Sequence, residues 1–151
     1  MTPPEAEIVP ADLVGSWNLR SWLIHYPDGR ETGMPFGSDP SGWLQYHPDG
    51  SMSATVHRSD REPFPAGISP RRLDSDLVAR AYRSYFHYAG LYRIEGDCVI
   101  HSVLHSLNQA MVGTDQVRRM QLEPPILTLT GDETYRDGTR RHELVWERRN
   151  V

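Results

Sequence analysis

Stretches in which apolar and polar residues alternate recur along the chain, and this period of two predicts β-strands. The alternation is clearest on either side of a polar link at 108–114, where Val and Leu are interleaved with His, Ser, Gln and Arg. Eight stretches are expected to be strands: 17–26, 42–47, 51–57, 89–94, 99–106, 116–122, 126–130 and 142–148. In the first, one face should carry Trp17, Leu19, Ser21 and Leu23, and the other Arg20, Trp22 and Ile24.

Turn signals separate these stretches. Tyr26-Pro27-Asp28-Gly29 and His47-Pro48-Asp49-Gly50 share a pattern in which Pro presets φ at the second position and Gly takes the left-handed conformation at the fourth. Further turn signals lie at 95–97 and 136–138. Short strands joined by hairpin turns form an antiparallel meander, and eight such strands can close into a barrel that holds one small ligand. The sequence therefore predicts an all-β fold, an antiparallel barrel of eight strands, and of no more than about ten.

Two segments interrupt the meander between the third and fourth predicted strands. Residues 58–72 are rich in Pro and contain Gly67, which predicts a long loop or a lid. Residues 73–87 have helical spacing, because apolar positions recur at i, i+4 and i+8 in Leu77, Ala81 and Tyr85. We expect an α-helix here that packs on the barrel through its aromatic residues, Tyr82, Tyr85 and Phe86. The alternative is that a tyrosine hydroxyl, with Tyr82 as the candidate, faces the mouth of a cavity.

Length and charge narrow the class of protein. A chain of 151 residues is expected to form one domain, here residues 11–151, after a flexible Pro- and Glu-rich tail at 1–10. The net charge of -4 and the lack of a basic stripe argue against nucleic acid as a partner. The start has neither a positive region nor an apolar segment typical of a signal peptide, and no run is long enough to span a membrane. We therefore expect a cytoplasmic protein.

Several kinds of chemistry are excluded or disfavoured. All 16 basic residues are Arg, so a Schiff-base lysine and a phosphate-loop lysine are both impossible. Cys98 is the only cysteine, which excludes an internal disulfide, and neighbouring Asp97 makes it a poor nucleophile. No Gly-x-Ser-x-Gly motif is present, and the carboxylates cluster in turns and tails, which disfavours a glycosidase mechanism.

Seven histidines invite a metal site. His101 and His105 have the spacing of a helical zinc pair, but in a strand they would lie about 13 Å apart and could not share one ion. We therefore expect neither a metal nor another cofactor, although a haem held by a single histidine stays open.

The remaining candidates are polar and aromatic residues expected to face the barrel interior. A buried neutral His101 could act as a general base, and Arg118 could hold a carboxylate or enolate oxygen. Arg118 and Arg119 are adjacent, so one should point inward, where it could instead pair with a structural acid. The candidate ligand-binding residues are Trp43, Tyr46, Tyr82, His105 and Asn108.

Several segments together resemble the lipocalin-like domain family of small bacterial and fungal barrels. They span nearly the whole chain, at 13–21, 39–54, 85–92, 112–119 and 144–148. The resemblance implies a lipocalin-like β-barrel. It also implies that Gly15 and Trp17 on the first strand pack against Arg148 or Arg149 to close the floor. His101 and Arg118 fall where the family keeps a His and an Arg.

Three functions are compatible with this chain. The first is binding of a small, mostly apolar molecule, such as a secondary metabolite, in the barrel cavity. The second is a cofactor-independent cyclase or isomerase that shapes a polyketide-like intermediate in natural product biosynthesis, as related small barrels do. The third is a structural or interaction domain with a filled core. A monomer or a homodimer is expected.

Overall fold

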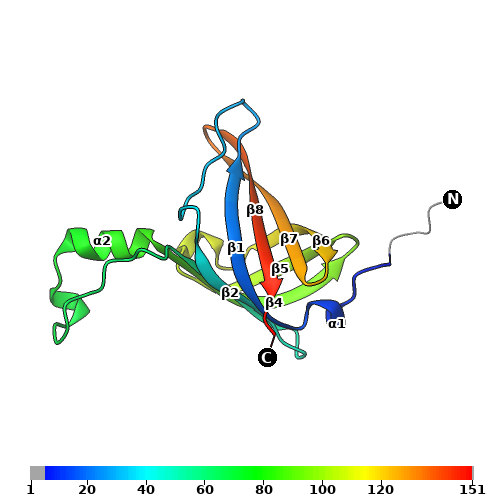
Figure 1. Ribbon diagram of the computed structural model, residues 1–151, viewed down its shortest axis with the longest axis horizontal. Coiled ribbons are helices and arrows are strands. Elements are labelled where there is room, and N and C mark those ends of the chain that lie inside the picture. Colours follow the sequence, from blue (N-terminus) through cyan, green and yellow to red (C-terminus); the bar gives the residue numbers. More distant parts are fainter. Residues whose placement is uncertain (1–5, 151) are drawn as a thin grey trace.

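Eight antiparallel strands close into a barrel in the computed structural model, which describes residues 6–150 (Figure 1). Each strand pairs with its neighbour in sequence, and the last pairs with the first, so the predicted eight-stranded barrel is confirmed. The strands are β1 (Gly15–His25), β2 (Ser41–Tyr46), β3 (Ser51–His57), β4 (Tyr85–Glu95), β5 (Cys98–Ser106), β6 (Asp115–Glu123), β7 (Ile126–Tyr135) and β8 (Gly138–Arg148).

The turn between β2 and β3 has the predicted chemistry. The amide of Gly50 donates to the carbonyl of His47 at 3.1 Å, and Gly50 has a φ of 89° that favours glycine. At the matching Tyr26 turn, the amide of Gly29 likewise donates to the carbonyl of Tyr26. That turn does not lead directly into β2, because a loop continues to residue 40 after a single bridge between Ile24 and Gly33.

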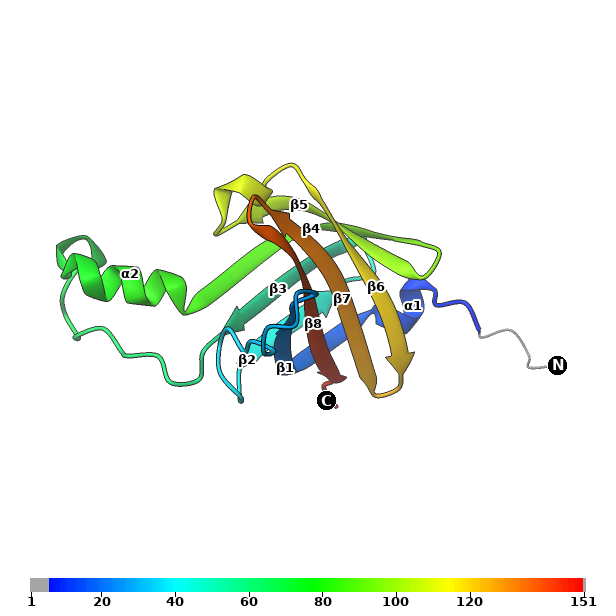
Figure 2. The same ribbon diagram turned by 90° about the horizontal axis from the view of Figure 1, so that it is seen from above.

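The predicted helix between β3 and β4 is confirmed, but it is shorter than the expected 73–87. Helix α2 spans Ser75–Arg83, and the carboxylate of Asp74 caps it by accepting from the amide of Asp76 at 2.8 Å. Residues 85–87 belong to β4, because Phe86 pairs with Val56 of β3. The helix projects away from the barrel, and none of its residues is buried (Figure 2). The helix is therefore not packed on the barrel as expected, although the Tyr82 hydroxyl donates to the carbonyl of Leu107 at 3.5 Å. The loop at 58–72 contributes no residue to the wall of the interior cavity, so it does not form a lid on it.

A β-bulge changes which residues of β1 face inward. The register of β1 against β8 shifts between Leu19 and Ser21. Because an extra residue inverts the alternation, Trp22 and Ile24 follow Trp17 and Leu19 into the interior. The predicted division of this strand into two faces is therefore wrong beyond Leu19.

A second bulge shapes β5 opposite Gly90. Ala89 pairs with His105 and Gly90 with Val103, which leaves Leu104 as the extra residue. A Cβ built on Gly90 would overlap the carbonyl oxygen of Ser102, a backbone atom that cannot move without breaking the sheet. This position therefore requires glycine because of close backbone approach.

We expect Gly90→Ala to lower the free energy of unfolding by about 2 kcal/mol or more, since overpacking against backbone forces the strands apart. Gly33→Ala is the matched control, because a Cβ there meets only side-chain atoms at ordinary contact distances of 3.5 Å and beyond. Urea denaturation of both variants measures the difference. Equal stability of the two variants would contradict the close approach at Gly90.

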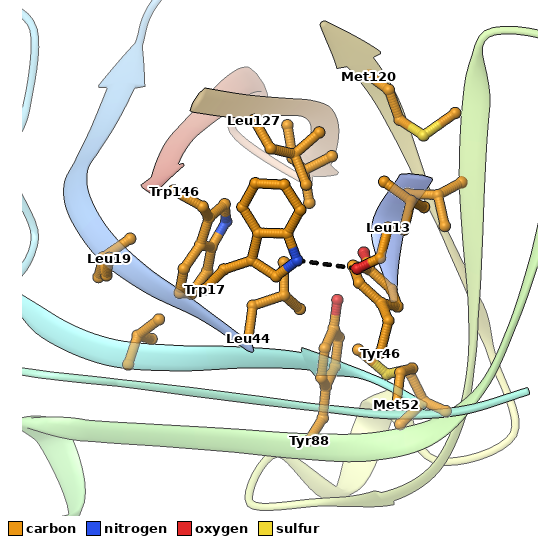
Figure 3. Close-up of a cluster of buried hydrophobic side chains, with 14 of the residues drawn as sticks. Leu13, Trp17, Leu19, Leu44, Tyr46, Met52, Tyr88, Met120, Leu127 and Trp146 are labelled. Atoms are coloured by element: carbon orange, nitrogen blue, oxygen red, sulfur yellow. Dashed lines mark hydrogen bonds between the residues drawn. The ribbon is translucent and has the colours of Figure 1, made fainter. Parts of the chain in front are cut away.

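Trp17 closes one end of the barrel. It is fully buried, and its indole N–H donates to the carbonyl of Leu13 at 2.9 Å (Figure 3). The Arg148 guanidinium lies 4.2 Å from the Trp17 ring, and a Cβ on Gly15 would approach this guanidinium to 2.7 Å. Arg148 also donates to the carbonyl of Val14 at 2.8 Å. These contacts place Gly15, Trp17 and Arg148 together at the barrel floor.

Residues before position 11, which were expected to belong to the flexible tail, take part in the folded structure. Helix α1 (Pro10–Leu13) begins at Pro10, and Ile8 packs against the buried core. The part of the predicted tail at 1–5 lies outside the described residues.

The wall is open between parts of β6 and β7. These strands pair only from Arg119 opposite Thr130 to Glu123 opposite Ile126. Beyond Thr130, β7 continues to Tyr135 and pairs with β8 alone, so both strands are longer than the predicted 126–130 and 142–148. Residues 131–135 of β7 therefore form no ladder with β6. Arg118 lies where this ladder ends and lines both the interior cavity and an outer groove.

Candidate functional site

A cavity of about 280 Å³ lies inside the barrel. Aliphatic and aromatic side chains make up much of its wall: Trp22, Leu44, Ala54, Val56, Phe86, Tyr88, Met111, Leu129, Leu144 and Trp146. The polar or charged side chains that line it are His101, Asn108, Gln116, Arg118, Asp132, Glu133, Tyr135 and His142. A concave, largely apolar space with a few polar groups is the usual form of a small-molecule site, and this volume is just below the usual range of about 300–1,000 Å³.

His101 is the one buried polar side chain among the described residues, with 2% of its surface exposed. β5 directs it inward together with Val99 and Val103. One hydrogen bond of 2.7 Å joins its Nε2 to the hydroxyl of Tyr46, and another of 2.5 Å joins its Nδ1 to the hydroxyl of Tyr88. Both ring nitrogens are therefore engaged by protein groups.

Burial and the nearby Arg118 charge lower the pKa of His101 from 6.5 to about 3. The imidazole is therefore neutral at physiological pH. Burial also raises the pKa of Tyr46 and of Tyr88, so both phenols keep their protons. The triad of Tyr46, His101 and Tyr88 is thus an uncharged hydrogen-bonded unit beneath the cavity.

Arg118, and not Arg119, faces inward. It lies on β6 in phase with the buried Met120 and lines the cavity, whereas Arg119 is exposed and forms an ion pair of 3.5 Å with Asp97. The Arg118 guanidinium donates to the carbonyl of Val117 at 3.0 Å and to Gln116 Oε1 at 3.4 Å. Within residues 6–150, no carboxylate lies within 4.0 Å of it.

Gly131 makes room for this arginine. A Cβ at Gly131 would lie 2.6 Å from Nη1 of Arg118 and 2.9 Å from its Cδ. The Arg118 side chain therefore packs directly against the β7 backbone at Gly131.

A second chain of hydrogen-bonded side chains lies at the cavity wall formed by β1, β7 and β8. The indole N–H of Trp22 donates to His142 Nδ1 at 3.0 Å, so the proton of the neutral ring is on Nε2, which lies 2.9 Å from Glu133 Oε1. The Tyr135 hydroxyl donates to the same carboxylate. The hydrogen bond from His142 is the main cause that lowers the pKa of Glu133.

The predicted site residues separate into two groups. His101, Asn108 and Arg118 line the cavity. Tyr46 does not line it but is hydrogen-bonded to His101, which does. Asn108 caps the 3-10 helix η2 (Gln109–Met111), its Oδ1 accepting from the amide of Ala110 at 3.0 Å.

Three other predicted ligand contacts lie elsewhere, which corrects the expectation for them. Trp43 points outward, with 49% of its surface exposed, and the Arg149 guanidinium stacks on it at 4.5 Å. Tyr82 is exposed on the projecting helix. His105 follows the extra residue of the β5 bulge and is exposed as well.

Sequence reasoning missed Tyr88, Trp22, Gln116, His142 and Trp146 as cavity residues. Tyr88 could have been found from the alternation Phe86-x-Tyr88-x-Gly90, which the overlong helix prediction obscured. For Trp22 no local signal exists, because the bulge that turns it inward is set by pairing with β8.

No group of three or more metal-binding side chains comes together in the described part of the chain. The Cys98 thiol is partly buried beside Asp97, and both effects raise its pKa, in line with a non-nucleophilic role. Over residues 6–150, no helix has the length and apolarity needed to cross a membrane.

Fold and cavity together define a class, the antiparallel β-barrels with an internal pocket. The chain belongs to the lipocalin-like domain family, which matches residues 14–149, so the resemblance read from the sequence is confirmed. Among solved structures it is similar to bovine odorant binding protein in complex with a selenium-containing odorant. The identity is 12%, the match covers 100% of this chain and 79% of that chain, and the TM-score is 0.48. No curated protein matches the chain.

Proposed function

We propose that this protein binds a small, mostly apolar molecule inside its barrel. The observation that carries the proposal is the cavity itself, which is walled by apolar and aromatic side chains and holds one guanidinium without a carboxylate partner. Burial of an apolar ligand surface in such a space is favourable by about 25 cal/mol per Å². A core filled by side chains, the structural alternative, would leave no cavity of this size.

The enzymatic alternative needs a general base, and the geometry of His101 does not favour that role. Both of its ring nitrogens are bonded to tyrosine hydroxyls, and a pKa of about 3 makes it a weak base. We therefore assign His101 the role of holding Tyr46 and Tyr88 in place. A cyclase or isomerase acting on a polyketide-like intermediate stays a prediction from the sequence, as do a cytoplasmic location and a monomeric or homodimeric state.

The proposal is tested with phenylnaphthylamine, a neutral aromatic probe whose fluorescence rises in apolar surroundings. The probe should bind the wild type, and Ala54→Phe, which fills the cavity from β3, should weaken binding about tenfold or more. Ser53→Phe is the matched control, because Ser53 is the neighbouring residue on the same strand and does not line the cavity. Equal binding by the two variants, or none by the wild type, would count against a ligand site inside the barrel.

A further inference from the structure

The carboxylate and amide side chains along the cavity wall each accept at least one hydrogen bond from a protein donor. Glu133 accepts from His142 and Tyr135, and Asp132 accepts from Nε of Arg141 at 2.9 Å. The side-chain oxygens of Gln116 and Asn108 accept from Arg118 and from the amide of Ala110. Among the carboxylate oxygens of the wall, only Oε2 of Glu133 and Oδ2 of Asp132 have no hydrogen bond to a described residue, and Asp132 is exposed to solvent.

Two side chains of the cavity wall, in contrast, have hydrogen-bond donors without an acceptor among the described residues. Trp146 lines the cavity and is 2% exposed, yet its indole N–H has no hydrogen-bond acceptor among residues 6–150. Arg118 offers five N–H groups, and its guanidinium makes only two hydrogen bonds to described residues. A buried donor without a partner is unfavourable, so the Trp146 N–H favours an incoming acceptor, and the remaining N–H groups of the half-buried Arg118 can donate to one as well.

A third donor follows from counting protons in the triad beneath the cavity. Two phenols and one neutral imidazole carry three protons, but only two hydrogen bonds join them. One hydroxyl hydrogen is therefore left over. On Tyr46, which does not line the cavity, it would have no acceptor among the described residues. On Tyr88, which does line the cavity, it can serve a ligand.

This count selects one arrangement of the triad. Tyr46 donates to Nε2 of His101, Nδ1–H of His101 donates to the Tyr88 oxygen, and the Tyr88 O–H points to the cavity. A phenol that accepts a hydrogen bond becomes a better donor, because hydrogen bonds in a chain polarise one another. Tyr88 also lies close enough to Arg118 for that charge to affect its ionisation.

We propose that the ligand of this cavity carries a carboxylate, which is held by the Arg118 guanidinium and the Tyr88 hydroxyl; this inference rests on the proposed binding function. Arg118 is the one cationic side chain of the wall, and no carboxylate of residues 6–150 lies within 4.0 Å of it; Asp132 pairs with Arg141 instead, and Glu133 accepts from the neutral His142 and from Tyr135. One guanidinium in a wall that also carries the Glu133 carboxylate suits a monoanion better than a phosphate dianion, which that carboxylate would repel more strongly. The rest of the ligand would be apolar, with an acceptor for Trp146.

The test compares two competitors of the same shape, naphthoate and naphthalenemethanol, in displacing phenylnaphthylamine at neutral pH. We expect the wild type to bind the acid at least about tenfold more tightly than the alcohol, because charge-assisted hydrogen bonds are about twice as strong as neutral ones. Arg118→Gln should bring the ratio close to one, and Tyr88→Phe should reduce it about threefold or more. Arg119→Gln is the matched control and should keep the full ratio, because that side chain lies outside the barrel.

The outcomes separate the two proposals. If the probe binds but acid and alcohol compete equally in the wild type, the carboxylate proposal fails while the binding function stands. If the ratio survives in both Arg118→Gln and Tyr88→Phe, the acid is held elsewhere and the proposal is equally overturned. If the wild type binds neither probe nor competitors, the binding function itself fails. The wild-type ratio needs no variant, so a misfolded mutant cannot leave the question open.

Discussion

Trp17→Ala is expected to leave the protein largely unfolded or to reduce its stability by about 3–5 kcal/mol, the usual cost of deleting a buried tryptophan ring. Trp17 is fully buried, bonds the carbonyl of Leu13 and supports the Arg148 guanidinium at 4.2 Å. Removing the ring opens a void and leaves Arg148 without its apolar support. Because domains of this size have only about 5–15 kcal/mol in total, this loss is a large part of the whole.

The matched control is Trp43→Ala, which removes the same side chain from the outer face of the neighbouring strand. Trp43 is 49% exposed, so its loss should cost no more than about 1 kcal/mol. Urea denaturation followed by far-UV circular dichroism compares the two midpoints. If Trp17→Ala were as stable as Trp43→Ala, the floor contacts would not be what holds the barrel together.

Acidification is expected to destabilise the wild type through His101. The pKa of this group is near 6.5 in the unfolded chain and about 3 in the folded state, because burial opposes the charged imidazolium. Between these values the unfolded state binds one proton more than the folded state. The free energy of unfolding should therefore fall by about 1.4 kcal/mol for each pH unit below 6.5, and the contribution is complete only above that pH.

Comparison with His101→Gln isolates this contribution, since glutamine does not titrate. We expect the variant to be less stable at neutral pH and to have a shallower dependence on pH between about 6.5 and 3. His105→Gln, at an exposed position of the same strand, is the matched control for replacing a histidine outside the core. Identical slopes in the wild type and His101→Gln would show that His101 is protonated in the folded state at its ordinary pKa.

The features that sequence predicted well are those decided within a few residues. The His47–Gly50 turn depends on Pro and Gly at fixed positions, and the structure has it as expected. The alternation likewise predicted that one of Arg118 and Arg119 faces inward, and the candidates His101 and Arg118 both line the cavity. Local chemistry and the period of a strand are sufficient for such predictions.

The errors come from interactions between strands that are distant in sequence. Tyr85 and Phe86 have helical spacing, yet pairing with β3 makes them part of a strand. The bulges in β1 and β5 invert the alternation, which brings Trp22 into the cavity and takes His105 out. Trp43 and Tyr46 are three residues apart and so must face opposite ways, but the sequence alone does not say which faces inward.

The projecting helix has a consequence for engineering. Its residues are unburied, and it is held to its own loop by Arg61, which donates to Ser84 Oγ, and by the ion pair of Arg80 with Glu62. The hydrogen-bonded perimeter of the barrel does not pass through it. The tip of the projecting segment between β3 and β4 is therefore a suitable insertion site. A fluorescent reporter or a second binding module could be inserted there while the barrel keeps all eight strands.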